Sequence, residues 1–258
     1  MELRTAIILC GGKGTRLGNI GKKIPKTLIK IQGYPIIWYI INILKKNNFN
    51  HFILPVGHKG NLIKKYINNH KKFKKDNIDV VPTGENSSIS KRIYKVKKII
   101  KSEIFLLLNG DAIFDANLDK IYKQHKSKKI DVSFITCCTE ADFGTVGIKN
   151  NKIIDFKRGI SFNTVKSNNN KNYFGLVYSG MAIMKKKILK ENFVNKSNFE
   201  KEFYPKIIKK YKCKSFDLDG TWHAMDNLKD INIINKKKEN INMYKKIKKI
   251  IIKLNNDR

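Results

Sequence analysis

Several features that mark other classes of protein are scarce or absent in this 258-residue chain. It has four cysteines, with no C-x-x-C pair and no histidines at zinc-site spacing, so free thiols are expected instead of a disulfide framework or a zinc site. The longest strongly apolar run, 36–41, is far too short to span a membrane. The chain opens on a strand pattern and not on a signal peptide, so we expect a cytoplasmic protein with no membrane partner.

Acidic residues and arginine are also few. The chain has 21 acidic residues against 54 basic ones, a formal charge of +33, yet only five of the basic residues are arginine. Such a charge raises the hypothesis of nucleic-acid binding. A lysine excess accompanied by abundant asparagine and isoleucine is better explained by a proteome-wide compositional bias, with lysines on the outer faces of helices. We therefore expect no nucleic-acid partner, although the field would attract anionic substrates.

The most informative pattern in the chain lies at 6–26. A short apolar run predicts a buried strand, and glycines mixed with cations follow it directly. These residues are Gly11, Gly12, Lys13, Gly14, Thr15 and Arg16, with Lys26 ten residues further on. Glycines let the backbone turn sharply so that its N–H groups can face phosphate oxygens, and the cations add charge suited to a polyphosphate. The pattern predicts a phosphate-binding loop.

Two common phosphate loops are excluded by what this segment lacks. A dinucleotide-binding loop requires a glycine three positions after Gly14, where Leu17 stands. A Walker loop requires Ser or Thr after Gly-Lys, whereas Gly12-Lys13 is followed by Gly14. The remaining alternative is a glycine-rich surface turn with incidental basic residues, and the buried strand before the loop counts against it.

Strand and helix patterns alternate through the first half of the chain. Strands are predicted at 51–56, 79–81, 104–108 and 132–137, and helices with one apolar face at 37–44, 62–67, 89–100 and 118–122. This alternation predicts an α/β fold with a mostly parallel sheet covered on both faces. The second half predicts a hairpin at 146–156, a polar loop at 167–171 and a long strand at 173–184. We expect one catalytic domain at 1–235 and a basic helical tail at 236–258.

Ligands of such sheets bind outside the carboxyl ends of the strands, where Asp111 follows an apolar strand and Gly110. A carboxylate there suits Mg²⁺, which takes one or two carboxylates plus phosphates and waters. The structural alternative for Asp111 is to cap the next helix. Asp226 begins the last apolar helix, where spacing alone favours an N-cap. His223 is interpreted as an exposed structural histidine.

The glycine loop followed by Pro25-Lys26 resembles the signature of the sugar-1-phosphate nucleotidylyltransferases. Stretches at 57–66, at 81–88 running on to Arg92, and at 225–230 are similar to the glucose-1-phosphate cytidylyltransferase branch, and the resemblance covers most of residues 6 to about 235. It implies a three-layer Rossmann-like nucleotide-binding fold of the nucleotide-diphospho-sugar transferase type, with a mixed, mostly parallel central sheet. It also implies an Mg²⁺-dependent transfer of a nucleoside monophosphate from an NTP, with CTP favoured, to a sugar 1-phosphate such as glucose 1-phosphate.

The resemblance also implies roles for individual residues. Arg16 would hold the leaving pyrophosphate, Lys26 the α-phosphate or acceptor phosphate, and Asp111 with Asp226 the metal. The residues implied in nucleotide binding are Leu9, Gly11, Gly12, Lys13, Gly14, Thr15, Thr83, Gly84 and Gly110. Those implied in sugar-phosphate binding are Lys157, Arg158 and Gly180. The substrates would be the partners, and homo-oligomerisation is left open.

The sequence departs from the family pattern at three places. Thr27 stands where the family often has a second proline, Ser90-Lys91 replaces Gly-Gly before Arg92, and 156–159 replaces a Glu-Lys-Pro motif whose lysine grips the sugar phosphate. The alternatives are therefore another nucleotide (GTP, UTP or dTTP), another acceptor (heptose 1-phosphate or phosphocholine), or a catalytically silent nucleotide-sensing relative.

Overall fold

The computed structural model describes residues 2–137, 145–149, 152–157, 164–166, 172–174, 176–191, 199–237 and 241–256. A seven-stranded sheet lies at its centre, in the order β14-β8-β13-β6-β1-β4-β5. The strands are β1 (Thr5–Leu9), β4 (His51–Val56), β5 (Asn77–Pro82), β6 (Ile104–Asn109), β8 (Val132–Cys137), β13 (Val177–Lys185) and β14 (Cys213–Asp217). Only β13 runs antiparallel to its neighbours β6 and β8, so the predicted mixed, mostly parallel sheet is confirmed.

Helices cover both faces of this sheet. The helices are α1 (Gly18–Lys23), α2 (Ile36–Lys46), α3 (Gly60–Asn69), α4 (Ile89–Val96), α5 (Leu118–Ser127), α6 (Tyr204–Lys210), α7 (Leu228–Asn235) and α8 (Ile241–Asn255). Alternate residues of β1 point to opposite faces, so Ile8 packs in a core with α2, α3 and α5, while Ile7 packs in a second core with α4 and α6. The three-layer prediction is confirmed.

A short two-stranded sheet stands beside the main one. β7 (Ala112–Asp115) pairs antiparallel with β15 (Thr221–Ala224), so that Ala112 lies opposite Ala224. The N–H of Met225 donates to the carbonyl of Asp111 at 2.9 Å and extends the pairing by one residue. Neither strand was predicted from the sequence. Their pairing joins the end of the first half of the chain to the segment before α7.

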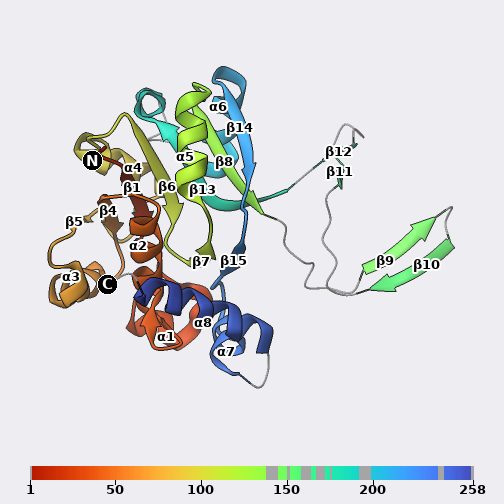
Figure 1. Cartoon of the computed structure of the whole chain (residues 1–258), viewed down its shortest axis with the longest axis horizontal. Helices are drawn as coiled ribbons and strands as arrows, with labels where there is room; N and C mark the ends of the chain where they lie inside the picture. Colours follow the sequence, from red (N-terminus) through yellow and green to blue (C-terminus); the bar gives the residue numbers. More distant parts are fainter. Residues whose placement is uncertain are drawn as a thin grey trace.

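Further hairpins complete the described structure. β2 (Lys30–Ile31) pairs with β3 (Tyr34–Pro35), β9 (Thr145–Lys149) with β10 (Lys152–Lys157), and β11 (Thr164–Lys166) with β12 (Asn172–Phe174). The predicted hairpin at 146–156 is confirmed by the β9–β10 pair, which projects from the body together with β11–β12 (Figure 1). The long strand expected at 173–184 is divided, because β12 ends at Phe174 and β13 begins at Val177. The polar loop at 167–171 lies outside the described residues.

The basic C-terminal segment forms a helix that packs onto the domain. Ile247, Ile250 and Leu254 of α8 are buried in the first core, and Lys253 forms a 2.9 Å ion pair with Asp115 at the end of β7. The expected helix is therefore present, while the domain boundary at 235 stays a prediction. No helix in the described part of the chain has the length and apolarity needed to cross a bilayer.

The fully buried His125 of α5 should make stability depend on pH. Its Nδ1 lies 2.8 Å from the Ser133 hydroxyl, and Nε2 has no hydrogen-bond partner among the described residues. Burial, helped by the charge of Lys185 and opposed by Asp131, lowers the pKa of His125 from 6.5 to about 4. The unfolded chain binds the proton more readily than the folded chain. The free energy of unfolding is therefore unaffected by His125 above pH 6.5 and falls by about 3 kcal/mol as the pH drops from 6.5 toward 4.

We expect urea unfolding of the wild type to lose more free energy between pH 7 and pH 4.5 than unfolding of His125→Asn. The asparagine amide can keep a bond to Ser133 but does not titrate, so it serves as the matched control. An equal loss in both proteins would show that His125 does not cause the dependence.

Candidate functional site

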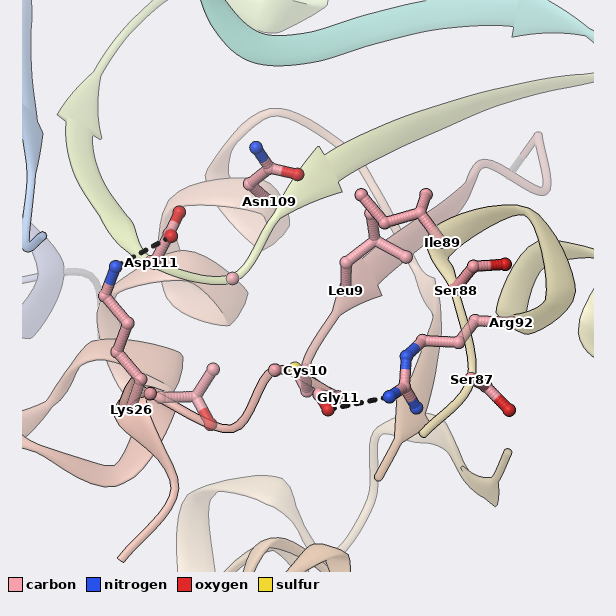
Figure 2. Close-up of a pocket in the computed structure, with 14 residues that line it drawn as sticks. Leu9, Cys10, Gly11, Lys26, Ser87, Ser88, Ile89, Arg92, Asn109 and Asp111 are labelled. Atoms are coloured by element: carbon pink, nitrogen blue, oxygen red, sulfur yellow. Dashed lines mark hydrogen bonds and ion pairs between the residues drawn. The ribbon is translucent and has the colours of Figure 1, made fainter. Parts of the chain in front are cut away.

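A pocket of about 400 Å³ opens at the carboxyl ends of β1 and β6 (Figure 2). It lies where parallel sheets of this kind bind ligands. The predicted site residues that line it are Leu9, Gly11, Gly12, Gly14, Lys26, Gly110 and Asp111. Lining residues that were not predicted are Cys10, Thr27, Ser87, Ser88, Ile89, Arg92 and Asn109. The predicted phosphate loop therefore forms one wall, and the start of α4 forms the wall opposite.

The glycine loop brings main-chain donors to this pocket. β1 ends at Leu9, and in the described part of the chain the N–H groups of Gly11 and Gly12 donate no hydrogen bond. Gly14 has φ 62°, a left-handed conformation that favours glycine. A Cβ on Gly110 would lie 2.7 Å from the Leu9 carbonyl oxygen, so glycine is needed for the turn after β6 to approach the loop. The loop has the free donors that an anionic ligand requires.

Two carboxylates and two cations meet at one edge of the pocket. Lys26 Nζ lies 2.8 Å from Asp111 Oδ2 and 3.0 Å from Asp226 Oδ1 (Figure 2 shows the contact with Asp111). Arg16 Nη1 lies 3.8 Å from the same Asp226 oxygen. The Lys26 side chain is 16% exposed and that of Arg16 is 77% exposed, so Lys26 is held while Arg16 extends into solvent. The four predicted catalytic and metal residues are brought together.

The β7–β15 pair explains why Asp111 and Asp226 are neighbours. Asp111 directly precedes β7 and Asp226 follows β15 after one residue, so antiparallel pairing places them at the same end. The expectation that Asp226 is an N-cap is wrong, because Asn227 caps α7 in a capping box with Asp230. Likewise Asn117, and not Asp111, caps α5. Neither carboxylate is used by a helix, so both are available to a ligand.

This pair of carboxylates fits a divalent cation. Mg²⁺ is commonly held by one or two carboxylates together with phosphate oxygens and waters. The described residues hold no group of three or more His, Cys, Asp or Glu side chains suited to a metal, so phosphates and waters would complete the shell. The position between Asp111 and Asp226 already takes a positive charge, the Lys26 ammonium.

The other predicted site residues lie at varying distances from the pocket. Lys13 and Thr15 are exposed on the glycine loop, outside the pocket lining. Thr83 and Gly84 do not line the pocket but accept hydrogen bonds from Arg92, which does. The sequence indicated Arg92 only through the resemblance at 81–92.

The residues expected to bind the sugar phosphate are only partly described. Lys157 is the last residue of β10, and Arg158 lies outside the described residues. Gly180 has φ 77°, and a Cβ there would lie 2.7 Å from Asn109 Nδ2. Because Asn109 lines the pocket, Gly180 packs behind the pocket wall.

His223 differs from its prediction. It is half-buried and not exposed, and burial together with the charge of Lys246 on α8 lowers its pKa. Its Nε2 has no hydrogen-bond partner in the described part of the chain. His223 lies on β15 under the C-terminal helix, which the sequence did not show packing there.

Comparisons with known proteins agree with this geometry. The family model described as "Nucleotidyl transferase" matches residues 5–241. A Bacillus subtilis (strain 168) protein named "Probable glucose-1-phosphate cytidylyltransferase" is 28% identical over 253 residues, covering 90% of this chain and 94% of its own. The D-glycero-alpha-D-manno-heptose 1-phosphate guanylyltransferase of Aneurinibacillus thermoaerophilus is 31% identical over 222 residues, covering 83% of this chain and 90% of its own.

A solved structure supports the fold. The inositol-1-phosphate CTP transferase from T. maritima superposes with a TM-score of 0.66 at 20% identity, over 96% of each chain. The resemblance drawn from the glycine loop is confirmed, and this chain belongs to the nucleotidyl transferase family.

Proposed function

We propose that this chain transfers a nucleoside monophosphate from an NTP to a sugar 1-phosphate and releases pyrophosphate, with CTP and glucose 1-phosphate as its substrates. The observation that carries the proposal is the convergence of Arg16, Lys26, Asp111 and Asp226 beside the free N–H groups of the glycine loop. The names of both sequence relatives describe nucleotidyl transfer to a sugar 1-phosphate, which supports the general reaction.

The chemistry needs no protein nucleophile. An oxygen of the acceptor phosphate attacks the α-phosphorus in line, the bond from that phosphorus to the β-bridging oxygen breaks, and pyrophosphate departs with those electrons. Both reactants are anions, so the protein's task is to position them and neutralise charge. The glycine loop and Arg16 hold the departing pyrophosphate, and Lys26 holds the α-phosphate or the acceptor phosphate.

Asp111 and Asp226 would hold Mg²⁺, which supplies further charge neutralisation at the phosphates when bound. In the structure Lys26 donates to these same two carboxylates. The ammonium charge repels a divalent cation placed beside the same two carboxylates. We therefore expect Lys26 to release the carboxylates as the metal–nucleotide complex arrives and to turn to a phosphate.

A second candidate is guanylyl transfer to a heptose 1-phosphate. The more similar of the two relatives by identity is a heptose 1-phosphate guanylyltransferase. The family's Glu-Lys-Pro motif, whose lysine contacts the sugar phosphate, is replaced at 156–159, and this replacement is consistent with a different acceptor sugar. This candidate keeps the mechanism and the four site residues but changes both substrates.

Pyrophosphate release with Mg²⁺ tests both candidates. With glucose 1-phosphate as acceptor, we expect kcat/KM for CTP to be about 100-fold higher than kcat/KM for UTP, GTP, dTTP or ATP. The reason is that a site that hydrogen-bonds a base edge rejects other bases strongly. Preference for GTP with heptose 1-phosphate would move the assignment to the second candidate. Tight NTP binding by folded protein, with no turnover on any acceptor, would indicate a silent relative.

A further inference from the structure

Arg92 carries a buried guanidinium that no carboxylate neutralises in the described part of the chain. The residue is 5% exposed and lies on α4, whose Ile93 and Val96 are fully buried in the second core. A buried charge must be compensated by hydrogen bonds if no counter-ion is present. The hydrogen-bond acceptors of the guanidinium therefore indicate the structural role of Arg92.

These partners come from three separate segments around the pocket. Nη1 donates to Thr83 Oγ1 at 2.7 Å, to the Gly84 carbonyl at 2.9 Å and to the Val56 carbonyl at 3.3 Å. Nη2 donates to the Gly11 carbonyl at 2.8 Å (Figure 2) and to the Glu85 carbonyl at 3.1 Å. One side chain thus ties the glycine loop after β1, the end of β4 and the loop after β5 to each other.

Two glycines leave the space that this guanidinium fills. A Cβ on Gly11 would lie 2.1 Å from Arg92 Cζ, and a Cβ on Gly57 would lie 2.6 Å from both Nη atoms. Real Cβ atoms do not approach so closely, so any side chain at either position displaces the guanidinium. Gly57 is outside the pocket lining, and its requirement for glycine is explained by Arg92 together with the Gly11 carbonyl oxygen, which would lie 2.7 Å from the same Cβ.

A second cation on α4 holds the 83–85 loop in the same way. Lys95, on the same helix, donates to the Thr83 carbonyl at 2.8 Å. The 83–85 loop is therefore held from α4 at two points, and α4 itself is anchored in the core. A loop held in this way presents its main-chain groups in one fixed arrangement.

We propose that Arg92 is a positioning residue for nucleotide selection. It fixes the Gly11 carbonyl in one pocket wall relative to the 83–85 loop, which leads into the opposite wall at 87–89, and thereby sets which main-chain groups of the two walls meet the nucleotide base. This inference rests on the proposed function only in taking an NTP as the ligand. Main-chain groups discriminate between bases through hydrogen bonds, and such bonds depend on exact position. Attraction for the phosphates depends on charge instead. A shift of one loop against the other should therefore reduce discrimination between bases more than it reduces the affinity for the phosphates.

The test measures binding, so it does not depend on turnover. Dissociation constants for CTP, UTP, GTP, dTTP and ATP are determined by calorimetry for the wild type, Arg92→Lys and Gly57→Ala. Lysine keeps the charge but cannot reach all the acceptors. Gly57→Ala forces the guanidinium and the Gly11 carbonyl that it holds out of their arrangement without removing either group. We expect both variants to lower the ratio between the best and the next-best nucleotide by about 10-fold.

Arg4→Lys is the matched control. Arg4 is also a buried arginine of this sheet, but it pairs with Asp119 at the amino-terminal edge, away from the pocket. We expect it to lower Tm by an amount similar to Arg92→Lys without changing the ratio. An unchanged ratio in both Arg92→Lys and Gly57→Ala, with only Tm lowered, would make Arg92 purely structural. If the wild type binds NTPs selectively but transfers nothing, the proposed transfer fails while this comparison still decides the role of Arg92.

Discussion

Replacing Asp111 with asparagine is expected to lower kcat by about 1000-fold while the fold is retained. The amide has nearly the same shape as the carboxylate but lacks its charge, so it weakens the hold on a divalent cation. The Asp111 side chain is 35% exposed at the pocket, so the substitution removes no core packing. Steady-state pyrophosphate release at saturating substrate measures kcat, and circular dichroism with a thermal melt checks the fold.

Asp115→Asn provides the matched control for this prediction. Asp115 lies at the other end of β7 and pairs with Lys253 at the surface. The same chemical change there should leave kcat within about twofold, because only a surface ion pair is lost. Chelation of divalent cations should reproduce the loss in the wild type. Wild-type turnover by Asp111→Asn at limiting Mg²⁺ would remove Asp111 from the metal site.

Replacing Lys26 with methionine is expected to have two effects of opposite sign. Turnover should fall by about 100-fold, because a cation that neutralises phosphate charge is lost. The affinity for Mn²⁺ without nucleotide should rise by about 10-fold, because Asp111 and Asp226 lose the ammonium that lies within 3.0 Å of each. Mn²⁺ titration followed by electron paramagnetic resonance measures this affinity directly.

Arg16→Met separates the two effects of Lys26. Arg16 is 77% exposed and lies 3.8 Å from Asp226, so its removal should change Mn²⁺ affinity little while still lowering turnover. Equal Mn²⁺ affinities in Lys26→Met and the wild type would contradict the exchange of Lys26 for a metal ion. Weaker Mn²⁺ binding in Lys26→Met would contradict it as well.

The sequence predicted the parts of the site that local patterns encode. A buried strand, a glycine run and spaced cations lie within one short segment, so the glycine loop, Arg16 and Lys26 could be placed at the edge of a sheet. Asp111 directly follows a strand, so its location could be derived in the same way. These elements need only strand direction and glycine chemistry to be placed.

The rest of the site depends on contacts between distant segments. Asp226 reaches Asp111 only because β15 pairs with β7 in one register, and both strands are too short to stand out in the sequence. Spacing favoured Asp226 as an N-cap, but the strand ends two residues earlier and Asn227 takes that role. Asp and Asn have similar capping preference, so only the register of the preceding strand decides between them.

The burial of Arg92 also depends on contacts between distant segments and could not be predicted from the sequence. An arginine within a lysine-rich amphipathic helix is typical of an exposed position. Its burial is possible only because acceptors from two loops and from the end of β4 converge on it. The C-terminal helix is similar, because the sequence predicted only a basic helical tail at 236–258. Its stripe of Ile247, Ile250 and Leu254 packs in the first core, and the helix covers the strand that bears His223.

The most direct test of the proposed reaction follows the α-phosphate of the nucleotide. CTP radiolabelled at that phosphate is incubated with the protein, Mg²⁺ and glucose 1-phosphate, and the products are separated by anion exchange. We expect the label in a sugar nucleotide, with one pyrophosphate formed for each labelled product, and neither product without the sugar phosphate. Label recovered as CMP, or pyrophosphate formed without an acceptor, would contradict transfer to a sugar phosphate.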